Sequence, residues 1–155
     1  MNHVLLHVFC IVMIAFTSRT AKADGPVSKA PQRVSIINGG DLVAVLSASR
    51  RSVTVYNQRT STETTVELLA PLPEDRDIAV SADFVAFQTD DSVYALNAKT
   101  AVWSQLQLPP DSELSFQVSD NAVFLLNDNV FYCYGRRADA WSGIRIEDGA
   151  TIPGK

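Results

Sequence analysis

The chain has little of the chemistry on which many enzymes rely. Its 155 residues include two histidines and two cysteines, and both histidines and Cys10 lie within the first 23 residues. Beyond residue 23, Cys133 is the single thiol and there is no histidine. That part of the chain therefore excludes a Ser-His-Asp triad, a zinc site that needs histidine and an intramolecular disulfide framework.

Positive charge is also scarce. Acidic residues outnumber basic ones by 17 to 13 over the whole chain. Because Arg19 and Lys22 lie in the first segment, the balance beyond residue 23 is 17 to 11 and the net charge there is −6. A basic nucleic-acid-binding surface is therefore not expected.

Long apolar runs are absent except at the N-terminus. Residues 4–16 form a largely apolar run of 13 residues, shorter than the roughly 20 that a membrane-spanning helix needs. Ala21-Lys22-Ala23 matches the A-x-A pattern of signal cleavage, so we predict cleavage between Ala23 and Asp24. Residues 1–23 are then a signal peptide and residues 24–32 a flexible lead-in. The mature protein is expected to be secreted or periplasmic, with no membrane anchor after cleavage. The alternative is a buried N-terminal helix.

Three segments of the chain repeat at intervals of about 40 residues. One series comprises residues 52–60, 92–100 and 129–134, with offsets of 40 and 37. A second comprises residues 41–45, 83–87 and 121–125, with offsets of 42 and 38. Trp103-Ser104 recurs as Trp141-Ser142, again at 38. Such a period predicts three copies of one structural unit.

Each unit is predicted to contain four short strands, which are rich in β-branched and aromatic residues and bounded by turn residues. The predicted strands are 34–37, 42–46, 53–57 and 64–69, then 78–82, 84–88, 92–97 and 103–108, then 114–118, 122–126, 129–134 and 141–146. No helical period is sustained beyond the leader. We predict an all-β chain with units at about 33–75, 76–112 and 113–148 and a short tail at 149–155.

The turns and the middle strands refine this prediction. Asn38-Gly39-Gly40, Thr89-Asp90-Asp91 and Asn127-Asp128 are predicted hairpin turns, because Gly, Asn and Asp tolerate a positive φ. The second strand of each unit is apolar throughout its centre, whereas a strand with one solvated face alternates. Both faces of these strands are therefore expected to be covered by neighbouring sheets.

Residues 92–109 are the best-formed copy of the repeat. A tyrosine on one strand (Tyr94), a turn, a tryptophan opening the next strand (Trp103), then Leu and Pro resemble the second half of a kelch-type propeller blade. The run Tyr94-Ala95-Leu96-Asn97, followed by Lys-Thr, is similar to the repeat of quinoprotein-type propellers. The resemblance covers roughly residues 33–148 and implies propeller architecture without implying an activity.

Two features depart from these families. The glycine pair of kelch repeats occurs once, at Gly39-Gly40, and Ala101 stands where quinoprotein repeats favour glycine. A quinone-cofactor protein is therefore a weak interpretation, and no cofactor is assigned.

Three units are fewer than a closed propeller needs. Propellers typically close with four to eight blades, and uncovered apolar sheet faces promote aggregation. We therefore expect a half-propeller. It is completed by a second copy of the chain, by a partner that supplies further blades, or by sequence that a truncated frame lacks. Two-fold pairing is the commonest symmetry and favours a homodimer. The alternative fold is a monomeric β-sandwich.

Aromatic and thiol side chains recur in apolar strands. Trp103 and Trp141, with Tyr94 and Tyr132, are predicted to pack between the repeats rather than to stack on a ligand. Cys133 lies between two tyrosines. It is predicted to be a buried, inert thiol, because no histidine can activate it.

The charged residues are interpreted mainly as turn and surface groups. Arg50-Arg51 and Arg136-Arg137 are predicted to be solvated loop pairs. Asp90-Asp91 and Asn127-Asp128-Asn129 carry oxygen ligands that suit calcium, but they lack EF-hand spacing, so a turn role is preferred. Asp83 and Asp120 recur before a strand, which also favours a turn role. No catalytic or metal-binding residue is assigned.

These observations predict an exported, non-enzymatic binding or scaffolding protein that completes a ring by self-association. The alternative, from another class, is an exported enzyme or enzyme fragment. Its site would form from Asp and Glu in the assembled ring, as glycoside hydrolysis by two carboxylates requires.

Overall fold

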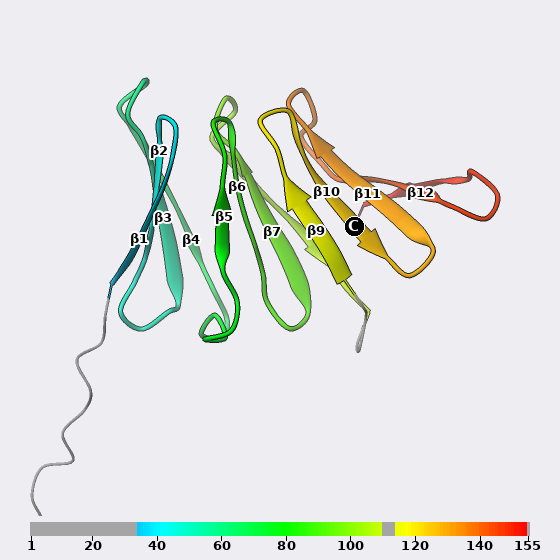
Figure 1. Ribbon diagram of the computed structural model, residues 1–155, viewed down its shortest axis with the longest axis horizontal. Helices are drawn as coiled ribbons and strands as arrows, with labels where there is room; N and C mark the ends of the chain where they lie inside the picture. Colours follow the sequence, from blue (N-terminus) through cyan, green and yellow to red (C-terminus); the bar gives the residue numbers. More distant parts are fainter. Residues whose placement is uncertain (1–33, 110–113, 155) are drawn as a thin grey trace, which may run out of the picture. The chain divides into compact units, whose positions relative to one another are not determined.

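The structure, a computed structural model, describes residues 34–109 and 114–154. These residues form three antiparallel sheets that follow one another along the chain, without any helix (Figure 1). The all-β prediction with three antiparallel sheets is therefore confirmed. The predicted signal peptide, its cleavage site at Ala23 and Asp24, and the lead-in at 24–32 lie outside the described residues.

Each sheet is a meander in which neighbouring strands in the chain pair. The first sheet comprises β1 (Ser35–Gly39), β2 (Leu42–Leu46), β3 (Ser52–Asn57) and β4 (Thr62–Glu67). The second comprises β5 (Ile78–Val80), β6 (Phe84–Gln88), β7 (Ser92–Asn97) and β8 (Val102–Gln107). The third comprises β9 (Leu114–Val118), β10 (Ala122–Asn127), β11 (Val130–Gly135), β12 (Ser142–Arg145) and β13 (Thr151–Pro153).

The fifth strand of the third sheet differs from the sequence prediction. Residues 149–155 were expected to form a tail, but β13 pairs with β12 through Gly143 opposite Ile152. A turn with Gly149 at φ 70° reverses the chain, and the amide of Arg145 donates to the carbonyl of Ala150 at 2.9 Å. Thr151 and Ile152 are β-branched, and they extend the sheet by one strand.

The hairpin turns follow the predicted positions, with one correction to their conformation. Gly40 and Asp128 have φ values of 59° and 49°, as the glycine and Asn-Asp turns predict. The prediction of a positive φ at Asp90-Asp91 is wrong, since neither residue has one. That turn is closed instead by the amide of Thr89, which donates to the carbonyl of Ser92 at 2.8 Å.

The sheets pack face to face and bury two apolar clusters. We call the face of a sheet that points toward the next sheet in chain order its forward face, and the opposite face its backward face. The forward face of the first sheet and the backward face of the second enclose one cluster, with Leu42 and Phe87 at its centre. The forward face of the second sheet and the backward face of the third enclose the other, with Phe84 and Tyr134.

Three successive sheets with two buried interfaces are not the two layers of a β-sandwich, so that alternative is wrong. The second sheet is the middle layer, and β6 and β7 are buried at every position. Over the described ranges, no helix is long and apolar enough to span a bilayer.

Candidate functional site

The repeated aromatic side chains lie between the sheets. Tyr94 is buried, and its ring stacks on Phe87 with the centroids 5.2 Å apart. Trp103 meets the edge of Phe87 at 5.8 Å. In the next interface, Trp141 is buried and lies 5.5 Å from the ring of Tyr134. These side chains fill the interfaces between sheets, so their faces are not free platforms for a ligand.

Tyr132 belongs to the same packing and explains a glycine. It lies on β11 opposite Gly143 on β12 and packs against the second cluster. A Cβ at Gly143 would lie 2.8 Å from the Tyr132 ring. The ring therefore requires the absence of a side chain at this position.

A charged group links the three sheets at one end of their strands. Asp83 is buried, and its carboxylate contacts a cation from each sheet. The Nη2 atom of Arg59 and the Nζ atom of Lys99 each lie 3.7 Å from it, and Arg136 contacts it directly. Figure 1 shows the reason for this convergence: the turns before β2, β6 and β10 and those after β3, β7 and β11 share one end of the meanders.

Hydrogen bonds between the sheets surround this charged group. The Asn97 side-chain amide donates to the carbonyl of Arg136 at 3.0 Å. The backbone amide of Ala82 donates to the carboxylate of Asp120 at 3.1 Å. Asp120 therefore joins the third sheet to the second, in addition to occupying a turn.

Most of this charged group was not predicted from the sequence. Arg136 was predicted to be solvated, but it is half-exposed and paired with Asp83. Arg59 and Lys99 were not singled out, although each lies two residues beyond the equivalent Asn57 or Asn97. That repeated spacing from an asparagine was the available signal.

Arg50 also departs from the prediction of a solvated pair. Its Nε and Nη2 atoms donate to the carbonyls of Leu72 and Pro73, both at 2.6 Å. Arg50 thereby fixes the link between the first and second sheets. It also lines a hollow of about 580 Å³, together with Glu74, Arg76, Asp77 and four other residues.

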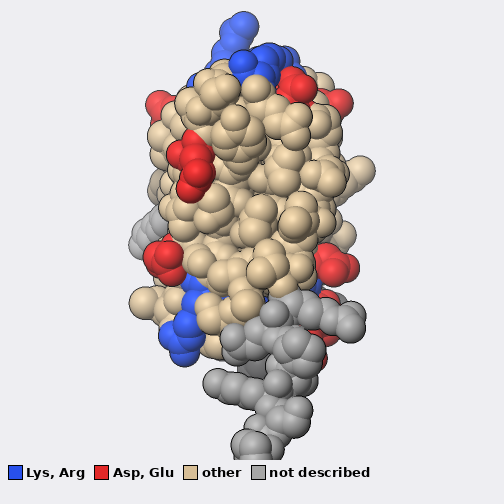
Figure 2. All heavy atoms as spheres, turned by 90° about the vertical axis from the view of Figure 1, so that its left-hand side faces the viewer, with Lys and Arg blue, Asp and Glu red and all other residues tan. Residues whose placement is uncertain are grey.

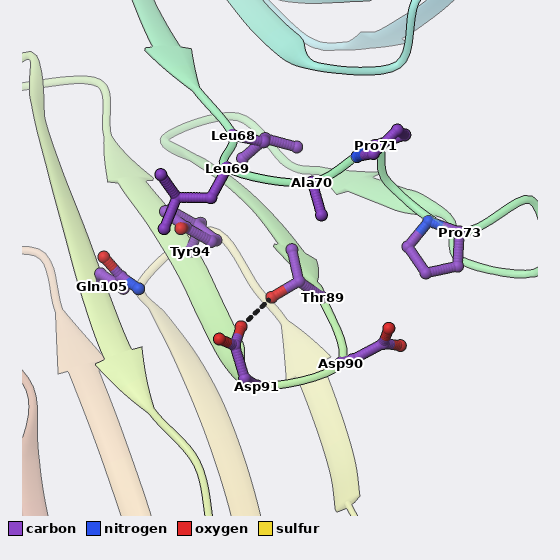
Figure 3. A pocket seen from close by; sticks show the side chains of 10 residues that line it. All are labelled: Leu68, Leu69, Ala70, Pro71, Pro73, Thr89, Asp90, Asp91, Tyr94 and Gln105. Atoms are coloured by element: carbon purple, nitrogen blue, oxygen red, sulfur yellow. Dashed lines mark hydrogen bonds between the residues drawn. The ribbon is translucent and has the colours of Figure 1, made fainter.

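A smaller pocket of about 220 Å³ is shown in Figure 3. It includes the turn after β6, so it lies at the opposite end of that strand from Asp83. Leucine and proline side chains of the segment 68–73 form one wall, and the turn before β7 forms another. Burial raises the pKa of Tyr94, and the negative charge of Asp91 raises it further. The Tyr94 phenol is therefore a neutral hydrogen-bonding group in an otherwise largely apolar wall.

The two carboxylates of this pocket do not converge. The hydroxyl of Thr89 donates to Asp91 at 3.0 Å, whereas the carboxylate of Asp90 points away from that of Asp91 (Figure 3). Asp90 and Asp91 therefore do not form the opposed pair that acid-base hydrolysis of a glycan needs.

Cys133 is placed differently from the prediction. It is only partly buried, on the forward face of the third sheet opposite Phe124. Burial still raises the pKa of its thiol, so the reactive thiolate is less populated than in a free cysteine. The misplacement has a physical cause: the strand is apolar, but no described residue covers that face.

Two sheet faces are left without a neighbour among the described residues. On the forward face of the third sheet, Leu126, Phe131 and Ile144 are 41%, 38% and 49% exposed. On the backward face of the first sheet, Ile36 is 64% exposed and Tyr56 is 41% exposed. Figure 2 shows this latter face, whose centre is uncharged and whose charged residues lie toward its margins. Exposed apolar side chains grouped on one sheet face are typical of interaction surfaces.

No family model matches the chain, and no curated protein matches it. Among solved structures, it is similar to a chain in the S. cerevisiae complex of a Dbp5 variant with Nup159, a Gle1 variant, IP6 and ADP (17% identity, TM-score 0.42). It is also similar to the WD40 domain of SCAP from fission yeast (14%, 0.37) and to Kluyveromyces lactis Hsv2 (12%, 0.38).

The matches cover 71%, 80% and 78% of this chain, in that order. They cover 29%, 32% and 38% of the three known chains, so this chain spans about a third of their length. These likenesses concern the arrangement of strands alone.

Proposed function

We propose that this chain is an exported, non-enzymatic binding or scaffolding protein whose three sheets complete a ring by self-association. The observation that carries the proposal is the pair of sheet faces, one at each end of the stack, whose apolar side chains no described residue covers. Equivalent faces inside the stack bury Phe84, Phe87 and Trp141. Apolar side chains on a sheet face are stable when another sheet covers them.

The charged group around Asp83 supports a scaffolding role. It ties the turns of three sheets together at one end, and this fixes the turns at that end relative to one another. The pocket between residues 68–73 and Tyr94 adds a hollow for a small, largely apolar ligand at the other end. Binding a ligand in this pocket requires no catalytic group, in agreement with a non-enzymatic role.

Two measurements test this proposal. The full chain is expressed with its leader, and the protein recovered from outside the cytoplasm is expected to begin at Asp24. Its mass by light scattering on a sizing column is expected to be twice that of residues 24–155. A folded monomer contradicts self-association, and retention of the first 23 residues contradicts processed export.

The carboxylate enzyme stays the alternative prediction. It is tested with a glycan panel on the assembled protein, with single Asp→Asn and Glu→Gln variants of its exposed carboxylates. Hydrolysis that disappears in one of these variants, while the mass of the assembly is unchanged, would replace the binding role by catalysis.

A further inference from the structure

The two uncovered faces differ from their counterparts inside the stack in a complementary way. Strand pairing defines equivalent positions: the pairs Val55–Thr64, Ala95–Ser104 and Cys133–Ser142 each span nine residues around the same turn. The three sheets can therefore be compared residue by residue.

At the central positions of the forward faces, the first and second sheets carry small residues and the third sheet carries large ones. Ala44 and Ala86 lie in the middle of β2 and β6, where Phe124 occupies the same place on β10. Val53 and Val93 are likewise replaced by Phe131 on β11. Phe124 and Phe131 stack on each other, with centroids 5.8 Å apart. The third sheet therefore presents a raised aromatic centre.

The backward faces show the opposite change. Tyr94 and Tyr132 lie in the middle of β7 and β11, and the equivalent residue on β3 is Thr54. Phe87 and Leu125 are replaced by Val45 on β2. At these central positions the backward face of the first sheet therefore carries smaller side chains than those of the second and third sheets, whereas Tyr56 is at least as large as its equivalents Leu96 and Tyr134.

Outer strands follow the same rule. Trp103 and Trp141, which pack in the two interfaces inside the stack, correspond to Glu63 on β4. Glu63 is exposed and lies on the outer strand of its sheet, where the rim of an interface stays hydrated. At these central positions each inner interface sets small forward residues against large backward ones, whereas Leu42 and Phe84, at the starts of β2 and β6, are large and correspond to Ala122. A pairing of the third sheet with the first would set large against small, at a similar total volume.

At the end of the sheets that carries Asp83, the charges of the third and first sheets complement each other in the same pairing. Arg59 reaches from the first sheet to Asp83 of the second. The residue equivalent to Arg59 in the third sheet is Arg137, which is exposed. The residue equivalent to Asp83 in the first sheet is Asp41, whose side chain is half-exposed. A third-to-first contact would therefore repeat the ion pair that joins the first sheet to the second.

From this complementarity of size and charge, we infer that the forward face of the third sheet docks on the backward face of the first sheet of a second copy. This inference rests on the proposed self-association and specifies its surfaces. Such a contact is heterologous. Two copies make it twice, and six sheets lie within the range in which propellers close.

Paired variants on the two faces test this inference. Phe131→Glu on the third sheet and Ile36→Glu on the first each place a charge in the apolar contact, and both residues are exposed in the single chain. Each variant is expected to weaken the dimer by at least about 100-fold, because an unpaired buried charge is costly, and to elute as a folded monomer. The control is Val102→Glu. Val102 is 45% exposed on β8 of the second sheet, so it lies on neither of the two faces that are inferred to dock.

Mixing the two monomeric variants gives the decisive result. The Ile36→Glu chain keeps an intact third sheet, and the Phe131→Glu chain keeps an intact first sheet. An equimolar mixture is therefore expected to form a one-to-one complex that neither variant forms alone. If Phe131→Glu breaks the dimer but Ile36→Glu leaves it intact, the third sheets pair with each other and this inference is wrong, while self-association stands. A monomeric wild-type chain contradicts both.

Reversing the charges of one ion pair tests the same contact if Phe131→Glu or Ile36→Glu fails to fold. Arg137→Asp and Asp41→Arg are surface changes, and each alone is expected to weaken the dimer about tenfold. The double variant is expected to recover the wild-type mass at the same concentration. Failure of the double variant to recover would contradict the Arg137–Asp41 contact and the pairing that it accompanies.

Discussion

The second and third sheets are built from similar strands but meet different surroundings. β7 carries apolar residues at its four central positions and β11 at nearly every position, and β7 is buried throughout. In β11, Phe131 is exposed and Cys133 is only partly buried. The difference comes from the neighbours: the second sheet is covered on both faces, and the third on one face among the described residues. Burial in this fold is therefore decided by the stacking of sheets and not by the strand alone.

The largest expected effect contrasts two phenylalanines on these sheets. Phe87 is fully buried between the first and second sheets, and Phe131 lies on the uncovered face. Phe87→Ala is expected to lower the free energy of unfolding by about 3–5 kcal/mol, since it removes a buried ring and leaves a cavity. Phe131→Ala is expected to cost about 1 kcal/mol or less in dilute monomer. Urea unfolding at low protein concentration measures both.

Equal losses for the two variants would mean that the uncovered face is already buried in dilute solution. Repeating the titration at high concentration sharpens the comparison. The loss from Phe131→Ala should then grow, because association stabilises the folded state by mass action. The loss from Phe87→Ala should not depend on concentration in this way.

The sequence was sufficient to predict the strands because the signal for them is local. Short runs rich in β-branched and aromatic residues, and turn residues such as Gly40 and Asp128, specify a meander within each unit. The contacts between units were not predictable in the same way. Asp83 contacts cations from three sheets, and these contacts depend on how the turns of neighbouring sheets are placed. Cys133 was misplaced for the same reason, since its strand does not reveal which face is covered.

The second prediction contrasts two equivalent carboxylates. Asp83 is buried beside Arg59, Lys99 and Arg136, while Asp41 is half-exposed and, among the described residues, pairs with Arg59. Asp83→Asn is expected to cost about 1–3 kcal/mol, a value reduced from that of a fully buried pair because the cations are partly solvated. Asp41→Asn is expected to cost about 0.5 kcal/mol or less in the monomer. Thermal unfolding of both variants at low and high salt tests this difference.

A loss for Asp41→Asn as large as that for Asp83→Asn would contradict the ranking by burial. Salt should reduce the effect at Asp41 more strongly, because exposed charges are screened and buried ones are less so.

The third prediction uses two glycines of the third sheet. A Cβ at Gly143 would lie 2.8 Å from the Tyr132 ring, whereas a Cβ at Gly135 would meet no atom within 4 Å. Gly143→Ala is expected to cost about 1–3 kcal/mol, because the covered face has no room to relax. Gly135→Ala is expected to be neutral within about 0.5 kcal/mol. Urea unfolding distinguishes them, and a neutral Gly143→Ala would show that Tyr132 moves freely.

The smallest expected effect concerns one turn in the first sheet and one in the second. Whether the sheet is covered on one face or on both should make no difference to these turns. Ser61 before β4 and Ala101 before β8 have φ values of 53° and 55°, in a region that is strained for residues with a side chain. Ser61→Gly and Ala101→Gly are each expected to stabilise the protein by about 0.5–1 kcal/mol, since the relief of strain exceeds the entropy that glycine loses on folding. Differential scanning calorimetry should give similar gains for both.

Similar gains at Ser61 and Ala101 would mean that the turns obey local rules whichever sheet they serve. A gain at Ala101 alone would mean that the covered second sheet holds its turn more tightly than the first sheet does. The matched pair thus separates what a repeat unit specifies for itself from what its neighbours impose. The positive φ of Ala101 is strained because this residue has a side chain, since only glycine adopts this conformation without cost.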